Sequence, residues 1–407
     1  MKAAFVTYGG GHVSSVAPVI RELQTKRGWD VRVLGLTNAG RLLSTLGIPF
    51  IGFRELVTAE DGRALELGEQ LAETYHQESS GVPRSEAIAY LGLSFMDLMN
   101  RIGEDAARAR LAEIGRRAFL PLGPLRRFLQ SEPFDVVVAT NSPRAEEAAI
   151  RAAGELSIPS LCMVDLFGID WEPCVPAENG FADRVTVFSE FTKELLVARG
   201  RHADDVLVTG NPAFDTLAKW APEESEALRR EYGWGTKKVI LWASQKIPEP
   251  ELKAAMFDEF ERLAADHPDW IVLYRPHPSE AGATLASSAA LRLCPSEPPL
   301  GVLLRTVQAV VVVNSTLGVE AALCGSPVVQ IMGSSISASA PYRELGIATE
   351  VHDLEHLSEA IAEVIDSRSP LSKQLASGRS KLPAAGGATS RVTDVIVSLA
   401  KKHMEQP

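Results

Sequence analysis

The sequence predicts an α/β protein built from two doubly wound parallel sheets in tandem. Short apolar runs alternate with helical segments of ten or more residues along most of the chain. This alternation begins twice, near residue 2 and again near residue 237. Several runs, such as Val310–Val313, are apolar at every position, as expected for strands that helices cover on both faces. The pattern therefore indicates two domains of the same class.

The expected elements follow from the positions of these runs. In the first block we expect a helix near residues 15–26 and strands at residues 2–8, 30–36, 134–140, 160–165 and 184–189. In the second block we expect strands at residues 239–243, 270–274, 309–313 and 327–331. A charged helix at about residues 390–402 closes the chain.

The domain boundaries are placed by the turn between the two blocks. Gly210-Asn211-Pro212 is typical turn chemistry, and proline suits the first turn of a helix. We expect an N-terminal domain at residues 1–200 and a C-terminal domain at residues 201–388. The last helix, in residues 389–407, is expected to pack back on the N-terminal domain.

Residues 62–130 depart from the alternation. The segment is long, charged and helical in period, and it contains no convincing strand. It predicts a helical insertion in the first domain. The insertion would be a flap over a cleft or a binding surface; the alternative is a plain helical decoration.

Composition narrows the class of protein. The 407 residues are 45% hydrophobic, carry a formal net charge of −11 and contain no long basic run, so nucleic acid is a poor partner. The four cysteines form no Cys-x-x-Cys pair. The apolar N-terminus is too short for a signal peptide, and no apolar run reaches the roughly 18 residues of a membrane span. We expect a soluble cytoplasmic protein.

A glycine-rich loop follows the first expected strand. Gly9, Gly10 and Gly11 let the backbone approach a ligand closely, and a helix follows. The stretch is neither Gly-x-Gly-x-x-Gly nor a Walker loop, which disfavours a dinucleotide or ATP. His12, at the tip of this loop, is a candidate general base; the alternative is a histidine that caps the helix or binds a substrate hydroxyl.

Polar residues also follow two other strands of the first block. Asp165 ends a buried strand and is a candidate base or orienting group, although Asp170 and Glu172 follow closely and compete for that role. Asn141 follows the strand at residues 134–140 and is a candidate ligand contact at the same sheet edge; the alternative is helix capping by its neighbour Ser142.

In the second block, candidate phosphate ligands follow two strands. Arg275 and His277 offer donors for phosphate oxygens, and a proline on each side of His277 restricts its backbone. The alternative is a strand-ending turn with a surface histidine. Ser244 and Gln245 supply hydrogen-bonding groups after the first strand of this block.

The most informative stretch runs from the valines at 310–313 into a polar loop and a helix. Ser315 and Thr316 are expected at the N-terminus of that helix, where backbone N–H groups and the helix dipole favour an anion. Glu320, about one turn further on, is placed to accept hydrogen bonds from sugar hydroxyls. An anion site beside a carboxylate suits a nucleotide sugar. The sequence has no Asp-x-Asp pair, so no metal site is expected.

Taken together, these motifs resemble the GT-B glycosyltransferases. The resemblance implies two Rossmann-like domains facing a cleft, with the acceptor on the first domain, near Gly10, Gly11 and Asn141, and the nucleotide sugar on the second. It assigns the phosphates to Arg275, His277, Ser315 and Thr316, the ribose or sugar to Glu320, and the donor side to Ser244 and Gln245.

The resemblance also bears on the donor nucleotide. The His-Pro and Ser-Thr pairs are similar to those of bacterial sialyltransferases and CDP-glycerol glycerophosphotransferases, so a UDP-, CDP- or CMP-linked donor is implied. The expected reaction is metal-independent transfer of a sugar, or a sugar-like group, to a hydroxyl on a glycan, lipid or small molecule. His12 or Asp165 would be the base, no separate cofactor is expected, and the biological setting would be cell-envelope or glycoconjugate biosynthesis.

Two alternatives remain. The non-hydrolysing UDP-N-acetylglucosamine 2-epimerases share this fold, and Gly210-Asn211-Pro212 and Glu320 fit them, whereas Ala243–Ile247 stands where that family has His-Arg-Arg-Glu-Asn. A non-catalytic nucleotide-sugar-binding protein on the same fold is the second alternative.

Overall fold

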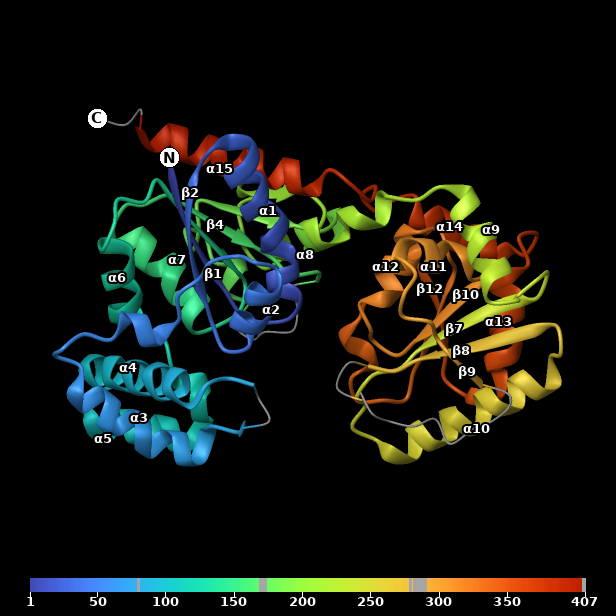
Figure 1. Ribbon diagram of the computed structural model, residues 1–407, viewed down its shortest axis with the longest axis horizontal. Helices are drawn as coiled ribbons and strands as arrows, with labels where there is room; N and C mark the ends of the chain where they lie inside the picture. Colours follow the sequence, from blue (N-terminus) through green and yellow to red (C-terminus); the bar gives the residue numbers. More distant parts are fainter. Residues whose placement is uncertain (79–80, 168–173, 278–279, 281–290, 405–407) are drawn as a thin grey trace. The chain divides into compact units, whose positions relative to one another are not determined.

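The computed structural model describes residues 1–78, 81–167, 174–277, 280 and 291–404. The chain divides into two compact units, which are described separately (Figure 1). Unit 1 comprises Met1–Ala213 and Gly387–Pro407, and unit 2 comprises Phe214–Gly386.

Unit 1 is organised around a parallel six-stranded sheet with the order β2-β1-β3-β4-β5-β6. Its strands are β1 (Lys2–Thr7), β2 (Asp30–Gly35), β3 (Val136–Thr140), β4 (Ser160–Met163), β5 (Arg184–Val187) and β6 (Val206–Val208). The first five confirm the expected strands. The three-residue β6 was not expected, because a run this short carries too little periodicity to be recognised.

Helices cover both faces of this sheet, as the apolar strands require. They are α1 (Gly11–Arg27), α2 (Ala39–Thr45), α7 (Ala145–Glu155), α8 (Glu190–Ala198) and α15 (Ala388–Met404), besides the inserted helices described below. On β3, Val136 and Val138 point toward α1, α2 and α15, whereas Val137 and Ala139 point toward α7 and the inserted helix α6 (Leu122–Gln130). Alternate side chains of one strand thus enter two separate cores.

The first helix begins earlier than expected. The sequence predicts a start near residue 15, but α1 begins at Gly11, because Gly10 adopts a φ of 66° and turns the chain directly into the helix. His12 therefore lies in the first helical turn and not at the tip of a loop.

The closing helix α15 packs on α1 within unit 1. Val392 and Ile396 are fully buried in the same core as α1, and Asp394 accepts a hydrogen bond of 2.7 Å from Arg27.

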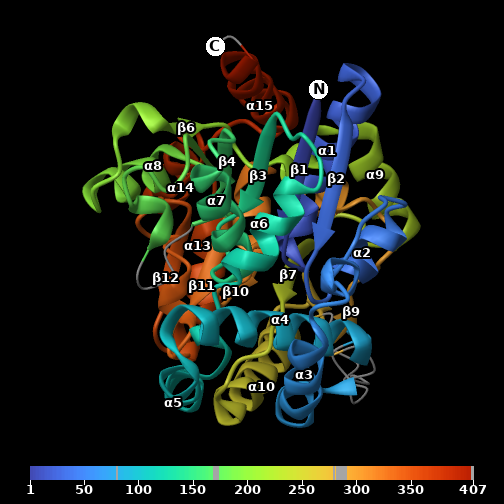
Figure 2. The same cartoon turned by 90° about the vertical axis from the view of Figure 1, so that its left-hand side faces the viewer.

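The helical insertion expected at residues 62–130 is confirmed. It contains α3 (Gly62–Tyr75), α4 (Arg84–Ile102), α5 (Glu104–Ile114), the 3₁₀ turn η3 (Gly115–Ala118) and α6 (Leu122–Gln130). Helices α3 and α4 lie side by side in both views (Figures 1 and 2). They approach closely where Gly68 faces Gly92: a Cβ added to Gly92 would lie 1.9 Å from the carbonyl oxygen of Ala64.

Unit 2 contains a second parallel six-stranded sheet with the order β12-β11-β10-β7-β8-β9. Its strands are β7 (Lys238–Ala243), β8 (Trp270–Arg275), β9 (Leu291–Leu293), β10 (Ala309–Val312), β11 (Val328–Ile331) and β12 (Ala348–Val351). Its helices are α9 (Pro222–Glu231), α10 (Pro250–Asp266), α11 (Leu300–Thr306), α12 (Leu317–Leu323), α13 (Leu357–Ile365) and α14 (Pro370–Arg379). The edge strands β9 and β12 were not expected, again because they are short.

Each sheet reverses its strand order at one point. In unit 1 the reversal lies between β1 and β3, and in unit 2 it lies between β7 and β10. In open α/β sheets the loops at the carboxyl ends of such neighbouring strands separate and leave room for a ligand. The two loop pairs at these reversals carry most of the candidate residues.

Candidate functional site

The glycine loop of unit 1 is shaped by close packing. A Cβ on Gly9 would lie 1.4 Å from Oδ1 of Asn38, and the φ of 66° at Gly10 is one that only glycine adopts readily. Gly11 faces Asp165, with an added Cβ 3.5 Å from its Oδ2. These glycines let α1 begin directly after β1 and place His12 over the carboxyl end of β3.

His12 is held by a hydrogen-bonded chain. Its Nδ1 lies 2.7 Å from Oγ1 of Thr140, the last residue of β3. The Thr140 hydroxyl in turn donates to Oε1 of Glu146, and the backbone N–H of Tyr8 donates to the same oxygen at 2.7 Å. Three residues from separate elements are thus joined to the imidazole.

Glu146 is a member of this site that sequence reasoning missed. Its side chain is 0% exposed, and burial raises the pKa of its carboxyl. A signal was present: Glu146, Ala149 and Ala153 share one face of α7, and the alanines mark that face as buried. A carboxyl group on a buried face needs a polar partner, which Thr140 and Tyr8 provide.

Asp165 lies on the other side of the imidazole, and Asn141 anchors its backbone. Oδ2 of Asp165 is 3.9 Å from Nε2 of His12, and its side chain is 34% exposed. Asn141 accepts a hydrogen bond of 2.7 Å from the backbone N–H of Asp165, which links the ends of β3 and β4. Asp165 follows β4 by two residues rather than ending it. Asp170 and Glu172 lie outside the described residues.

The unit 1 candidates therefore gather at one place. His12, Asp165, Gly10, Gly11 and Asn141 surround the reversal between β1 and β3, together with Thr140 and Glu146. An imidazole between two carboxyl groups is chemically suited to accept a proton and to be stabilised as the cation that results.

In unit 2, Gln245 bridges the reversal between β7 and β10. Its Oε1 accepts a hydrogen bond of 3.1 Å from the backbone N–H of Asn314, and the Asn314 amide donates to Oγ of Ser339 at 2.7 Å. Ser244 is buried, and its backbone N–H donates to the carbonyl oxygen of Arg275 at 2.9 Å. Ser244 and Gln245 thus connect the carboxyl ends of three adjacent strands, β8, β7 and β10.

Ser315, Thr316 and Glu320 lie around the start of α12, which is seven residues long. Oγ of Ser315 accepts from the backbone N–H of Leu317 at 3.3 Å, and Thr316 is exposed. The hydroxyl of Tyr342 donates to the carbonyl oxygen of Ser315. Gly318 leaves the space that the Tyr342 ring occupies, because a Cβ there would lie 2.9 Å from it.

Glu320 and Arg275 are close enough to interact electrostatically. Burial raises the pKa of the Glu320 carboxyl to about 7, and the charge of the nearby Arg275 opposes part of that rise. Arg275 is the last residue of β8 and is half-buried, which places a guanidinium at the carboxyl edge of the sheet. A fixed cation beside a hydrogen-bond acceptor can hold a phosphate and a neighbouring hydroxyl.

His277 is exposed, and its backbone is anchored. Its N–H donates to Oε2 of Glu280 at 3.0 Å, and Tyr274 donates its hydroxyl to the same oxygen at 3.3 Å. Lys253 pairs with the other carboxylate oxygen of Glu280. Glu280 was not singled out from the sequence, since nothing local indicates that it closes a turn. The prolines on either side of His277 include Pro278, which lies outside the described residues.

The described part of the chain has neither a cluster of metal-binding side chains nor a membrane-spanning helix. No group of three or more His, Cys, Asp or Glu side chains there is arranged to hold a metal ion. Within the same residues, none of the helices has the length and apolar character needed to cross a membrane.

Comparison with known proteins identifies the fold. No protein-family model and no curated protein sequence matches the chain. Among similar solved structures are UDP-GlcNAc 2-epimerase from Neisseria meningitidis bound to UDP-GlcNAc, at 15% identity and a TM-score of 0.61 over 98% of this chain and 100% of that one. The S. aureus MnaA–UDP complex is 17% identical with a TM-score of 0.61, over 100% of this chain and 99% of that one.

A glycosyltransferase of kitacinnamycin is similar as well. It is 15% identical to this chain, with a TM-score of 0.57 over 98% of this chain and 99% of that one. The resemblance seen in the short motifs thus extends to the architecture of the whole chain, and at these identities it concerns the fold. The two parallel sheets with flanking helices and these structural relatives together establish that the chain has the GT-B fold.

Proposed function

We propose that the chain is a glycosyltransferase that moves a sugar from a nucleotide-linked donor to a hydroxyl acceptor. The observation that carries this proposal is the way His12 is held. Its Nδ1 contacts the Thr140 hydroxyl at 2.7 Å, and Oγ1 of Thr140 donates its only hydrogen to Glu146. With the Glu146 carboxylate ionised, Thr140 must therefore accept from the imidazole, and the proton of a neutral imidazole resides on Nδ1.

This arrangement leaves Nε2 of His12 with its lone pair. Tyr8 also donates to Oε1 of Glu146, and these two hydrogen bonds, together with the nearby imidazole, favour the ionised carboxylate and oppose the effect of burial on its pKa. An unprotonated ring nitrogen beside a sheet reversal is what a general base for an acceptor hydroxyl requires. Asp165, with Oδ2 3.9 Å from Nε2, would stabilise the imidazolium formed.

The remaining chemistry is assigned to unit 2. The acceptor oxygen, having lost its proton to His12, bonds to the anomeric carbon of the donor sugar. The bond from that carbon to the phosphate oxygen breaks, and the nucleotide leaves with the electron pair. Arg275 would neutralise the charge that develops on the phosphate, with Ser315, Thr316 and His277 as further phosphate ligands and Glu320 as the partner of a ribose or sugar hydroxyl. Ser244 and Gln245 keep this group of loops in order.

Fold relatives support a nucleotide-sugar ligand. The Neisseria meningitidis protein is described with UDP-GlcNAc and the S. aureus protein with UDP, so a uridine nucleotide is the first donor to try. CDP- and CMP-linked donors come next, from the His-Pro and Ser-Thr motifs.

A second candidate is a 2-epimerase acting on a UDP-sugar. It is favoured by the TM-scores of 0.61 to two proteins of that kind, against 0.57 to the glycosyltransferase. Epimerisation needs no acceptor, whereas the held imidazole at the first sheet is matched to an acceptor hydroxyl. We therefore prefer transfer.

The deciding experiment follows donor and product together. The protein is incubated with UDP-, CDP- and CMP-sugars, with and without a mixture of hydroxyl acceptors, in magnesium and in EDTA, and the nucleotide and the sugar are analysed by mass spectrometry and NMR. Transfer predicts nucleotide release that acceptors accelerate and that EDTA leaves unchanged. Conversion of UDP-GlcNAc to its 2-epimer without release would replace the proposal by the epimerase.

A pair of histidine variants tests the base. His12→Ala should lower turnover by about 100-fold or more and leave the donor-induced thermal shift intact, because the donor is assigned to unit 2. His202→Ala, at an exposed position of unit 1, is the matched control. Full turnover in His12→Ala would refute the assignment, and a thermal shift without any turnover would indicate a binding protein.

A further inference from the structure

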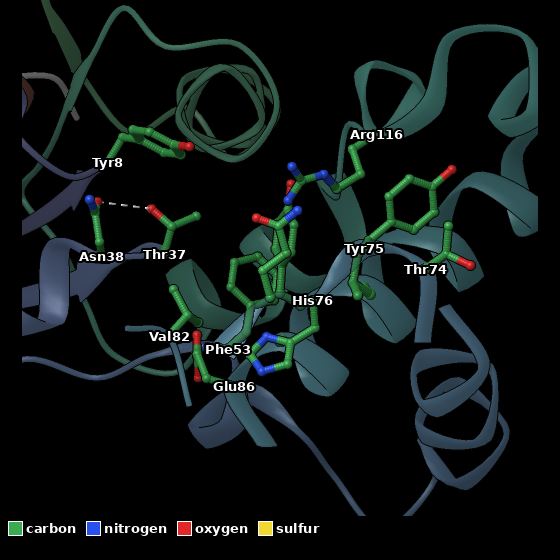
Figure 3. Close-up of a pocket in the computed structure, with 14 residues that line it drawn as sticks. Tyr8, Thr37, Asn38, Phe53, Thr74, Tyr75, His76, Val82, Glu86 and Arg116 are labelled. Atoms are coloured by element: carbon green, nitrogen blue, oxygen red, sulfur yellow. Dashed lines mark hydrogen bonds between the residues drawn. The ribbon is translucent and has the colours of Figure 1, made fainter. Parts of the chain in front are cut away.

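Unit 1 contains a cavity of about 460 Å³ between the carboxyl edge of its sheet and the helical insertion. In Figure 3, Tyr8, Thr37 and Asn38 lie on one side of it, and Tyr75 and Arg116 lie on the other. Building on the proposed function, we propose that this cavity binds the acceptor, and that the acceptor is a small, hydroxyl-rich compound that carries a carboxylate or phosphate group.

The cavity adjoins the proposed base. Tyr8 lines it, and the ring centroids of Tyr8 and His12 are 6.1 Å apart in an edge-on arrangement. Asn38 also lines it, and its amide packs against Gly9 of the glycine loop. A ligand held against Tyr8 is therefore close to His12, the group that would take its proton.

The accessible lining of the cavity is mostly polar. Phe53 and Leu91 contribute to its wall, but they are 0% and 2% exposed, so they offer a ligand almost no apolar surface. Thr74, His76 and Gln77 also line it, and their side chains form no hydrogen bond with any residue that the structure describes. This mixture of donors and acceptors suits hydroxyl groups, because a hydroxyl both donates and accepts.

Glu86 is the only acidic side chain among the described residues that line the cavity. Its two oxygens already accept hydrogen bonds from backbone N–H groups, from Phe53 at 2.7 Å and from Arg54 at 3.0 Å. Burial also raises the pKa of its carboxyl. Its negative charge is therefore partly suppressed, and what remains faces backbone donors instead of the cations of the cavity.

Two guanidinium groups lie at the cavity without an acidic partner. Arg116 lines it, with the guanidinium 5.9 Å from the centroid of the Tyr75 ring and directed inward in Figure 3. The guanidinium of Arg144 is 5.7 Å from the centroid of the Tyr8 ring and interacts electrostatically with the hydroxyls of Tyr8 and Tyr90, which both line the cavity. Neither arginine forms an ion pair within the described ranges.

The position of Arg144 is the stronger indication of an anionic ligand. Its φ of 77° lies outside the region that residues other than glycine prefer, and its side chain is half-buried. A half-buried cation without an acidic partner loses hydration and gains no counter-charge. Because the charges of Arg144 and Arg116 both act on the Tyr90 hydroxyl, a carboxylate or phosphate beside Tyr90 would meet both of them.

The test measures binding without a donor, so its result does not depend on turnover. Titration calorimetry in a phosphate-free buffer compares glucose, glucuronate, glucose 6-phosphate and inorganic phosphate. We expect glucuronate or glucose 6-phosphate to bind at least about tenfold more tightly than glucose, because a guanidinium makes charge-assisted hydrogen bonds to the acid. The acid of higher affinity identifies the anionic group, and it should also exceed inorganic phosphate, which lacks the sugar hydroxyls.

Three results would contradict the proposal. Equal affinity for glucose and for both acids would overturn the anionic group. Inorganic phosphate that binds as tightly as the better acid would overturn the hydroxyl-rich class. Binding of none of the four compounds would overturn the site.

Arginine variants locate the bound anion. Arg116→Met should remove most of the preference for the acid over glucose. Arg117→Met removes the same charge from the next, exposed position, which does not line the cavity, and should keep the preference. Arg275→Met, in unit 2, should keep it as well, which distinguishes the cavity from the proposed phosphate ligands of the donor. A preference that persists in Arg116→Met, or that disappears in Arg275→Met, would show that the anion is not held in the cavity.

A second pair of variants tests whether the ligand occupies the cavity. Ala87→Phe places a larger side chain in the lining and should weaken binding of the preferred acid at least about tenfold. Ala109→Phe, at an exposed position on α5, should leave the affinity unchanged. Where Ala87→Phe proves too unstable to assay, the comparison of Arg116→Met with Arg117→Met decides.

The two proposals fail in different ways. If the acid binds in the cavity and no donor ever yields a transferred sugar, the cavity stands and the transferase falls. If a sugar is transferred to neutral acceptors and neither acid binds, the transferase stands and the inference about the cavity falls.

Discussion

Nδ1 of His12 lies 2.7 Å from Oγ1 of Thr140, although 128 residues separate them in the chain. The contact exists because β1 and β3 are neighbours in the sheet while the helices that follow them lie on opposite faces. When Glu146 is ionised, Thr140 donates to it and accepts from the imidazole, so a neutral His12 carries its proton on Nδ1.

Thr140→Val should lower turnover by about 10- to 100-fold and leave the KM for the donor unchanged, because the imidazole loses the group that holds its tautomer and orientation. Steady-state kinetics would measure both constants. Thr140→Ser, which keeps the hydroxyl, should restore most of the rate. Thr186→Val, at a buried threonine of β5 in the same sheet, is the control for loss of a buried hydroxyl. An unaltered turnover number in Thr140→Val would contradict the role of Thr140.

The pH dependence of folding should report on Glu320. Burial raises its pKa from 4.5 to about 7, so the folded protein retains a proton that the unfolded chain loses. The contribution of this carboxyl group to the free energy of unfolding is therefore fully present below about pH 4.5. It is lost as the pH rises through about 7, and the loss is at most about 3 kcal/mol. Glu320→Gln has no carboxyl group to titrate at this position, so it should not show this loss of stability with rising pH.

Urea denaturation between pH 5 and 8 would measure the difference between the wild-type protein and Glu320→Gln. Glu261→Gln, at an exposed position on α10, is the matched control and should follow the wild-type curve. Parallel curves for the wild-type protein and Glu320→Gln would show that the carboxyl group titrates normally.

Arg275→Met should weaken nucleotide binding by roughly 10- to 100-fold, because charge-assisted hydrogen bonds to a phosphate are lost. Titration calorimetry with UDP, CDP and CMP would measure the change. Arg292→Met, at an exposed position on the neighbouring strand β9, should bind as the wild-type protein does. Equal losses in the two variants would indicate a general electrostatic effect and would remove Arg275 from the donor site.

Gly92→Ala should destabilise the helical insertion. The added methyl group would meet the carbonyl oxygen of Ala64 at 1.9 Å, and backbone atoms cannot move aside without separating α3 from α4. A cost of about 1–3 kcal/mol in the free energy of unfolding is expected. Gly62→Ala, where a methyl group meets nothing within 4 Å, should change stability by about 0.5 kcal/mol or less. Denaturant titration compares the two.

Much of the architecture was predictable from local patterns. Strands buried on both faces are apolar at every position, so β3 and β10 were recognised from runs such as Val310–Val313. The helical insertion was likewise visible from its period and its lack of strands. These features depend on neighbours in sequence, and their burial is encoded locally. The three-residue strands β6 and β9 and the four-residue β12 escaped, because pairing with a longer strand, and not local pattern, makes them strands.

The candidate site was predictable only in part, and the division has a physical reason. The sequence determined that His12 and Arg275 lie at the carboxyl ends of strands, and parallel strands end at one edge of a sheet. Only the tertiary structure decided that Glu146 joins His12 through Thr140 and that Gln245 ties β7 to β10. Such contacts depend on which strands become neighbours, and strand order is set by packing of the whole unit rather than by any local run of residues.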